Sequence, residues 1–125
     1  MPLKNESSFS RKDRLTTKAE FTAVFEKSKK LSQSWFLALY IQNQKAYPRL
    51  GMVISKRIVK KASSRNYIKR LIREGFRASK SKLGAVDLVI LTRRGCTTLD
   101  KPRLHKEIDN LWQQLIERSP KPCSS

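Results

Sequence analysis

Residues 64–77 read SRNYIKRLIREGFR, and their cationic and amide side chains have a spacing that a helix would bring onto one side. Each residue of a helix advances by about 100°, so these side chains fall within an arc of about 140°. They are Arg65, Asn66, Lys69, Arg70, Arg73 and Arg77. The residues roughly opposite are Ile68, Leu71, Ile72 and Gly75, with Phe76 at the margin. The pattern predicts a helix whose apolar side is anchored and whose other side presents a fixed row of cations.

A solvated surface helix is the alternative, but such a helix normally mixes charges to gain i,i+4 pairs. Here Glu74 is the one acid within residues 56–82. The flanks add further cations, namely Lys56, Arg57, Lys60 and Lys61 before the helix and Lys80 and Lys82 after it. Arginine grips phosphate with two donors and stacks on bases. Asn66 either reads a base edge or ribose hydroxyl, or merely solvates the helix start. The segment therefore favours phosphate binding.

The whole chain is strongly basic. It has 125 residues, with 28 Lys and Arg against 10 Asp and Glu, and a formal net charge of +18. Self-repulsion at this charge destabilises a compact state, so a polyanionic partner is expected, and nucleic acid fits best. No stretch is long and apolar enough for a membrane span, and the N-terminal sequence does not fit a secretory signal. We therefore expect a cytoplasmic protein whose Cys96 and Cys123 are reduced thiols.

Two further helices are predicted besides the basic one. Thr17 and Glu20 have the spacing of a capping box, so a helix is expected from there to about Lys27. Asp100 is the expected N-cap of a last helix. Its apolar positions at helical spacing are Leu104, Ile108, Leu111, Trp112 and Leu115. Ser63 or Ser64 is expected to cap the basic helix.

Three strands complete the prediction. Residues 34–42 and 49–55 are rich in β-prone side chains, and we expect them to pair antiparallel. Residues 85–92 have the composition of a buried strand. The α-β-β-α-β-α order predicts an α/β fold, a two-layer sandwich with one small sheet. We expect a single domain over residues 13–118, with flexible tails at 1–12 and 119–125.

Protein-based catalysis is not expected. A metal-dependent nuclease needs clustered carboxylates, and the ten acids of this chain are scattered along it. His105 is the single imidazole, and we interpret it as a surface or packing residue rather than a general base. No catalytic triad and no glycine-rich phosphate loop is present in the sequence. We predict no catalytic residue and no metal site on the protein.

At the basic segment the sequence resembles the protein subunit of bacterial ribonuclease P. The signature of that family, Arg-Asn-Arg-x-Lys-Arg-x-x-Arg-Glu, appears as RNYIKRLIRE at residues 65–74. The flanking stretches DRLTTKAEFTAVF, PRLGMVISKR and VDLVILTRRG also resemble the family, over about residues 13–116. One position departs, because Tyr67 stands where the family usually has arginine. On the helical wheel Tyr67 lies off the centre of the basic row.

The resemblance implies a mixed sheet with a left-handed βαβ crossover, in which the signature helix links two parallel strands. Ordinary handedness rules would instead predict a right-handed crossover. It implies that an RNA is the catalyst, with Mg²⁺ on that RNA, and that the substrate is precursor tRNA, whose 5′ leader is removed. The implied partners are the catalytic RNA and precursor tRNA, with no membrane and no small-molecule substrate.

The resemblance and the charge pattern together give two sets of site residues. The expected RNA-binding residues are Lys56, Arg57, Lys60, Lys61, Arg65, Asn66, Lys69, Arg70, Arg73 and Arg77. The resemblance implies a leader-binding cleft between the sheet and the first helix, with Phe21, Phe25 and Tyr40 as candidates. Spacing alone would more simply place Phe21 and Phe25 in the core, while Tyr40 is compatible with either role. Stacking of single-stranded bases on aromatics beside cations is the chemistry that supports the cleft.

Two other classes stay open on composition alone. A structural RNA-binding protein, such as a ribosomal component, would have a similar charge. A DNA-binding module is weaker, since the sequence lacks a helix-turn-helix pair or a dimer zipper. The aromatic residues before the basic helix favour the ribonuclease P subunit over the ribosomal alternative.

Overall fold

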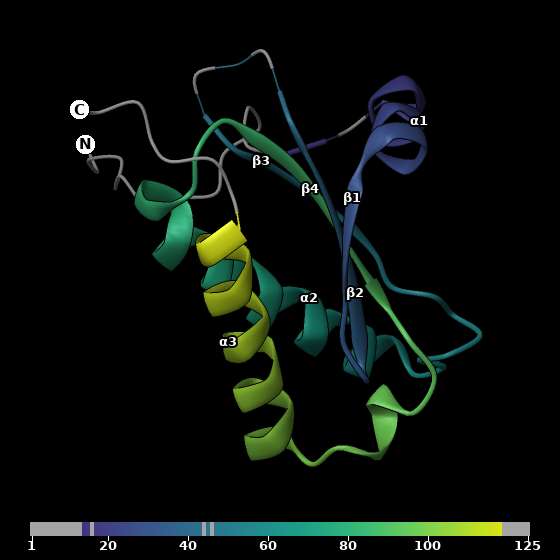
Figure 1. Ribbon diagram of the computed structural model, residues 1–125. Helices are drawn as coiled ribbons and strands as arrows, with labels where there is room; N and C mark the ends of the chain where they lie inside the picture. Colours follow the sequence, from purple (N-terminus) through teal and green to yellow (C-terminus); the bar gives the residue numbers. More distant parts are fainter. Residues whose placement is uncertain (1–13, 16, 44, 46, 119–125) are drawn as a thin grey trace, which may run out of the picture.

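The computed structural model describes residues 14, 15, 17–43, 45 and 47–118, and Figure 1 shows how its elements are arranged. The tails expected at residues 1–12 and 119–125, and Cys123, lie outside these residues. The helices are α1 (Lys18–Lys27), α2 (Ala62–Ser79) and α3 (Lys101–Arg118). The strands are β1 (Lys29–Ser32), β2 (Phe36–Gln42), β3 (Arg49–Val53) and β4 (Val86–Thr92). Two short 3₁₀ helices, Lys80–Lys82 and Cys96–Thr98, flank β4.

The strands form one mixed sheet in the order β1-β2-β4-β3. β2 pairs antiparallel with both β1 and β4, whereas β3 pairs parallel with β4. The expected antiparallel pairing of residues 34–42 with residues 49–55 is therefore wrong, because β4 lies between the strands that they form, β2 and β3. Almost every side chain of β4 is buried, so this strand takes the centre of the sheet. Helix α2 connects the parallel strands β3 and β4, as the resemblance implied, while the handedness of this crossover stays a prediction.

Strand β1 is an element that the sequence did not predict. Its four residues, KKLS, include a single buried side chain, Leu31, and give no recognisable alternation. The strand exists because its backbone pairs with β2, with Lys29 opposite Tyr40 and Leu31 opposite Ala38. A short, lysine-bearing edge strand of this kind also resists pairing with other chains.

The sheet is covered unequally on its two faces. The larger core joins α2 and α3 to one face, through strand residues such as Phe36, Ala38 and Ile90. A smaller core, with Val24 of α1 packed near Leu39 and Val89, lies on the other face. The expected packing of helices on a small sheet is confirmed, and α1 adds partial cover to the second face. The domain bounds of 13–118 stay a prediction.

The N-caps predicted for α1 and α3 are present in the structure, whereas the one predicted for α2 is not. The Thr17–Glu20 capping box is present, and the Asp100 carboxylate accepts a hydrogen bond from the Arg103 backbone N–H at 2.9 Å. Ser63 and Ser64 do not cap α2, which begins at Ala62 with Lys61 as its N-cap residue. The guanidinium of Arg65 reaches back instead and donates to the carbonyls just before the helix. The contact spans only five and six residues, but no helix-capping pattern predicts it.

Helices α2 and α3 meet at a glycine. A Cβ on Gly75 would come within 2.3 Å of the Trp112 indole, so only glycine allows this approach. The five apolar residues predicted for the last helix are all buried, as are Ile68, Leu71 and Ile72 of α2. Phe76, predicted at the margin of the basic row, is fully buried and packs its ring 5.9 Å from that of Trp112. The apolar side of the basic helix is thus anchored as expected.

Candidate nucleic-acid interface

The basic face, meaning Arg65, Asn66, Lys69, Arg70, Arg73 and Arg77, lies on the side of α2 away from its buried residues. Asn66 and Arg70 are exposed, and the other four are partly exposed. Arg70 pairs with Glu74 at 3.1 Å, but both side chains remain in solvent. An exposed pair of this kind contributes little to stability and is readily exchanged for a phosphate.

Arg65 differs from the other cations of this face. Its Nη1 donates to the carbonyl oxygens of Val59 and Lys60, each at 3.0 Å, and so ties the preceding loop to the helix. The Val59 side chain of this loop is fully buried. The predicted cations Lys56, Arg57, Lys60 and Lys61 are exposed on the same loop between β3 and α2. Arg65 therefore helps to hold the flanking cations next to the basic face.

A hollow of about 270 Å³ joins the basic face to α1. We call it the Phe21 hollow; its lining includes Arg14, Leu15, Phe21, Gly51, Lys69 and Arg73. Arg14 and Leu15 reach it because the chain before α1 runs beside β3, where the Leu15 N–H donates to the Leu50 carbonyl at 3.0 Å. An aromatic side chain and cations from two separate elements therefore border one space.

Phe21 lies over the backbone of β3 in this hollow. A Cβ on Gly51 would lie 2.6 Å from Cε1 of the Phe21 ring, so the ring approaches this closely only because residue 51 is glycine. Phe25 stacks beside Phe21, with ring centroids 6.5 Å apart, and 47% of its surface is exposed. Phe25 is thus largely outside the core, in contrast to the simpler reading of its spacing.

Tyr40 does not join the other two aromatic candidates. It belongs to the core on the α2 and α3 face of the sheet, whereas Phe21 packs on the α1 face. The expectation that Phe21, Phe25 and Tyr40 line one cleft is therefore wrong for Tyr40. Strand alternation places Tyr40 with Phe36 and Ala38, but which helix covers that face depends on long-range packing.

A partly buried ionic network fixes α1 against the sheet. Arg49 of β3 donates to both carboxylate oxygens of Asp87, at 3.0 and 2.8 Å, and to Glu20 of α1 at 2.7 Å. Asn43 adds a 2.8 Å hydrogen bond to Asp87. Hydrogen bonding to Asp87 raises the pKa of the Arg49 guanidinium above its ordinary value, so the arginine stays charged. No local pattern in the sequence indicates this network, which positions α1 and its aromatic pair.

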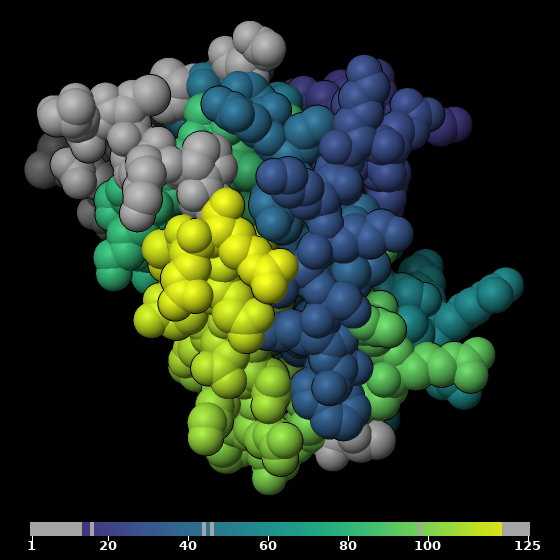
Figure 2. Space-filling view, viewed as in Figure 1, coloured from purple at the N-terminus to yellow at the C-terminus, as the bar shows by residue number. Residues whose placement is uncertain are grey.

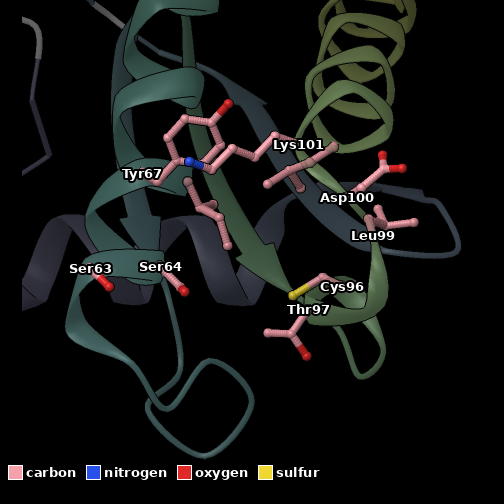
Figure 3. Close-up of a pocket in the computed structure, with 10 residues that line it drawn as sticks. Ser63, Ser64, Tyr67, Cys96, Thr97, Leu99, Asp100 and Lys101 are labelled. Carbon is pink, nitrogen blue, oxygen red and sulfur yellow. The ribbon is translucent and has the colours of Figure 1, made fainter.

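Tyr67, where the family usually has arginine, lies off the basic face as predicted. It packs partly against the core, and the Nζ of Lys101 lies 5.1 Å from its ring centroid. The pair borders a hollow of about 320 Å³ between the starts of α2 and α3, with Cys96 and Asp100 also in its lining. Figure 3 shows the Tyr67 ring and the Lys101 side chain next to one another in the lining of this hollow. Tyr67 thus contributes to the α2–α3 contact.

The remaining titratable candidates do not form a catalytic group. Cys96 is buried, which raises the pKa of its thiol, and it forms no disulfide with a described residue. His105 is 56% exposed and lies 3.1 Å from Asp109, in keeping with a surface role. Within residues 14–118, apart from those not described, no three His, Cys, Asp or Glu side chains gather as a metal site would require. None of the described helices is long and apolar enough to cross a membrane.

Comparison with known proteins gives a consistent result. The sequence model of a family described as Ribonuclease P matches residues 9–116. The structure of the Staphylococcus aureus RNase P protein has a TM-score of 0.73 and 26% identity, over 84% of this chain and 93% of that one. The RNase P protein from Thermotoga maritima, solved in complex with 1-(4-fluorophenyl)-2-thiourea, has a TM-score of 0.71 and 29% identity, over 81% and 98%.

The family model spans α1, α2, the four strands and most of α3, so the match bears on the whole fold. The matches confirm the resemblance found at residues 65–74. Members of the matching family are protein subunits of ribonuclease P, a tRNA-processing endoribonuclease whose holoenzyme contains RNA. The chain belongs to this ribonuclease P protein family.

Proposed function

We propose that this protein binds the catalytic RNA of ribonuclease P with the basic face of α2 and holds the 5′ leader of precursor tRNA beside Phe21 and Phe25. The observation that carries the proposal is the Phe21 hollow, where an aromatic ring of α1 meets Lys69 and Arg73 of the basic face. Family membership supports the RNA partner, and the geometry supports a division of the surface between two RNAs.

Electrostatics supplies the binding to the catalytic RNA. The buried side of α2 fixes the backbone that carries the cations, so binding a phosphate backbone costs mainly the rotamer freedom of their side chains. Each phosphate that is neutralised releases condensed counterions, which makes the affinity strongly dependent on salt. The loop cations Lys56, Arg57, Lys60 and Lys61 extend the same contact.

The leader is single-stranded, so its bases are free to stack. Base stacking on an aromatic ring contributes about 1–3 kcal/mol per base. Phe25 offers an exposed ring, and Phe21 offers a ring beside cations. The protein would thus add affinity for precursor over mature tRNA, since only the precursor has a leader.

Bond cleavage is assigned in this proposal to the RNA. Glu74 is the one acid within residues 56–82, so the basic face lacks the carboxylates that would hold Mg²⁺ next to a bound phosphate. Mg²⁺ would be held by the RNA, and the protein would position the substrate. The proposal implies a cytoplasmic location, because precursor tRNA is processed there.

Reconstitution tests the proposal. Purified protein is added to a bacterial ribonuclease P RNA at low Mg²⁺, and cleavage of precursor tRNA is measured. We expect the protein to stimulate cleavage and to lower the KM for leader-bearing substrate. An RNA that binds the protein but gains no cleavage activity at any Mg²⁺ concentration would contradict the proposal and favour a purely structural RNA-binding role.

A further inference from the structure

A second cationic hollow lies at the opposite edge of the sheet. Its volume is about 380 Å³, and we call it the Tyr40 hollow. It is lined by Lys27, Lys29, Tyr40, Ile41, Gln42 and Arg118. The three cations come from the ends of α1 and α3 and from the start of β1. Figure 2 shows the end of α3, in yellow, next to the blue surface of β1 and β2.

Strand pairing explains how these groups come together. Lys29 lies directly opposite Tyr40 in the antiparallel β1–β2 pair, so their side chains project from the same face of the sheet. Gln42, two residues further along β2, projects from that face as well. Helix α3 covers the same face and ends at Arg118. Tyr40 thus borders a hollow of its own, separate from the one that contains Phe21.

The charges in this hollow are not balanced from within. Its described lining contains no acid, and none of Lys27, Lys29 and Arg118 forms an ion pair with a described residue. Each cation has a local role, because Lys27 and Arg118 interact favourably with helix C-termini and Lys29 protects an edge strand. None of these roles requires the three to converge, and like charges at one site repel one another. An anionic ligand would relieve that repulsion.

Helix α1 connects this hollow to the Phe21 hollow. The chain enters α1 from beside Leu50 on β3, at one edge of the sheet, and leaves it directly into β1, at the other edge. The ten residues of α1 span about 15 Å. The exposed ring of Phe25 lies between the two ends. A single strand of RNA that stacks on Phe21 and Phe25 would therefore reach the Tyr40 hollow at the far end of the helix.

We infer that the Tyr40 hollow is a phosphate subsite for the part of the leader furthest from the cleavage site. Lys29 and Arg118 contact a phosphate of the leader backbone, Lys27 adds positive charge, and the Tyr40 hydroxyl donates a hydrogen bond to it. This inference rests on the proposed function, since it assumes that the leader lies along α1. It extends that function by giving the protein a means to distinguish long leaders from short ones.

A leader-length series tests the inference. Precursor tRNAs whose leaders are shortened from the 5′ end by one nucleotide at a time are bound to holoenzyme containing wild-type protein or the Lys29→Ala/Arg118→Ala variant. The matched control is Arg103→Ala/Lys106→Ala, which removes the same charge from exposed positions of α3 that do not line the hollow. Circular dichroism checks that all three proteins fold, and binding to the catalytic RNA alone is measured in parallel.

With wild-type and control protein, we expect affinity to rise in a step when the leader becomes long enough to reach the hollow. With Lys29→Ala/Arg118→Ala the step disappears, so long leaders bind about three- to tenfold more weakly while short leaders bind as before. Tyr40→Phe, which keeps the ring and removes the hydroxyl, should reduce the step by a smaller factor.

Two results would overturn the inference. One is a step that survives in the Lys29→Ala/Arg118→Ala variant, and the other is a loss of affinity for the catalytic RNA itself, which would assign the hollow to that RNA. The proposed function fails differently, namely if short leaders that reach only Phe21 and Phe25 add no affinity with wild-type protein. The two failures are therefore distinguishable in one series.

Discussion

The ring of Phe21 lies so close over Gly51 that a Cβ at residue 51 would come within 2.6 Å of it. The aromatic wall beside Lys69 and Arg73 therefore depends on a strand residue that has no side chain. Glycine within a strand often marks a close approach of this kind. It is also a signal in the sequence from which this contact could have been anticipated.

Gly51→Ala should displace the Phe21 ring, because the added methyl group cannot be accommodated without a shift. We expect weaker binding of leader-bearing tRNA and unchanged binding of mature tRNA, with a loss of stability of about 1–3 kcal/mol from overpacking. The matched control is Gly75→Ala, which causes a similar clash with Trp112 away from the hollow. If both variants lost leader-dependent affinity equally, general destabilisation would explain the effect.

Arg70→Ala should weaken binding to the catalytic RNA without changing the thermal unfolding midpoint. The chain offers a close control, because Arg70–Glu74 and Arg103–Glu107 are both i,i+4 pairs with a 3.1 Å contact. Arg103→Ala thus removes the same charge and the same kind of ion pair from α3. Filter binding at several salt concentrations gives the slope of log K against log salt, which is negative. Its magnitude should be smaller by about 0.7–0.9 for Arg70→Ala than for Arg103→Ala. Equal slopes would place Arg70 outside the RNA contact.

Phe25→Ala should reduce affinity for precursor tRNA by about 1–3 kcal/mol, the contribution of one stacked base. The ring is 47% exposed, so the fold should lose much less than the about 3–5 kcal/mol of a core phenylalanine. Equilibrium binding of precursor and mature tRNA, with urea unfolding alongside, separates the two effects. A parallel fall in affinity for both tRNAs would return Phe25 to a packing role.

Asp87→Asn should destabilise the protein by about 3 kcal/mol, because it leaves the partly buried Arg49 guanidinium without its main partner. The control is Glu107→Gln, which breaks a more exposed pair and should cost about 1 kcal/mol or less. The pKa of Arg49 is raised on folding, so its contribution is fully present below the pKa of the unfolded chain and is lost only as the pH rises through the higher pKa of the folded protein. Urea unfolding should therefore show that the contribution of this ion pair to the free energy of unfolding is kept between neutral pH and about pH 10. If Glu107→Gln lowered the free energy of unfolding as much as Asp87→Asn, the structural role of the network would be refuted.

Local patterns in the sequence were sufficient for much of the fold. The capping residues of α1 and α3, the buried side of α2 and the strand at β4 all rest on side chains within a few residues of one another, and the structure confirms each. The outward direction of Arg70 and Arg73 follows from the same periodicity.

Features that depend on distant pairings could not be predicted. The insertion of β4 between β2 and β3, and the existence of β1, are decided by which strands pair. Strand alternation shows which residues share a face with Tyr40, but it does not show which helices cover that face. The contact of Arg49 with Asp87 joins residues 38 positions apart. These features place the Phe21 and Tyr40 hollows at different edges of the sheet, so their separation could not be predicted from the sequence.

The salt dependence of binding to the catalytic RNA tests the central claim most directly. Wild-type protein is compared with the Lys69→Ala/Arg70→Ala/Arg73→Ala variant. The charge-matched control is Lys45→Ala/Arg103→Ala/Lys106→Ala, at three exposed positions outside the basic face. If the basic face of α2 binds the RNA, the magnitude of the negative slope of log K against log salt should be smaller by about 2 for the first variant than for wild type. The control should match the wild-type slope. Identical slopes for all three proteins would contradict the account.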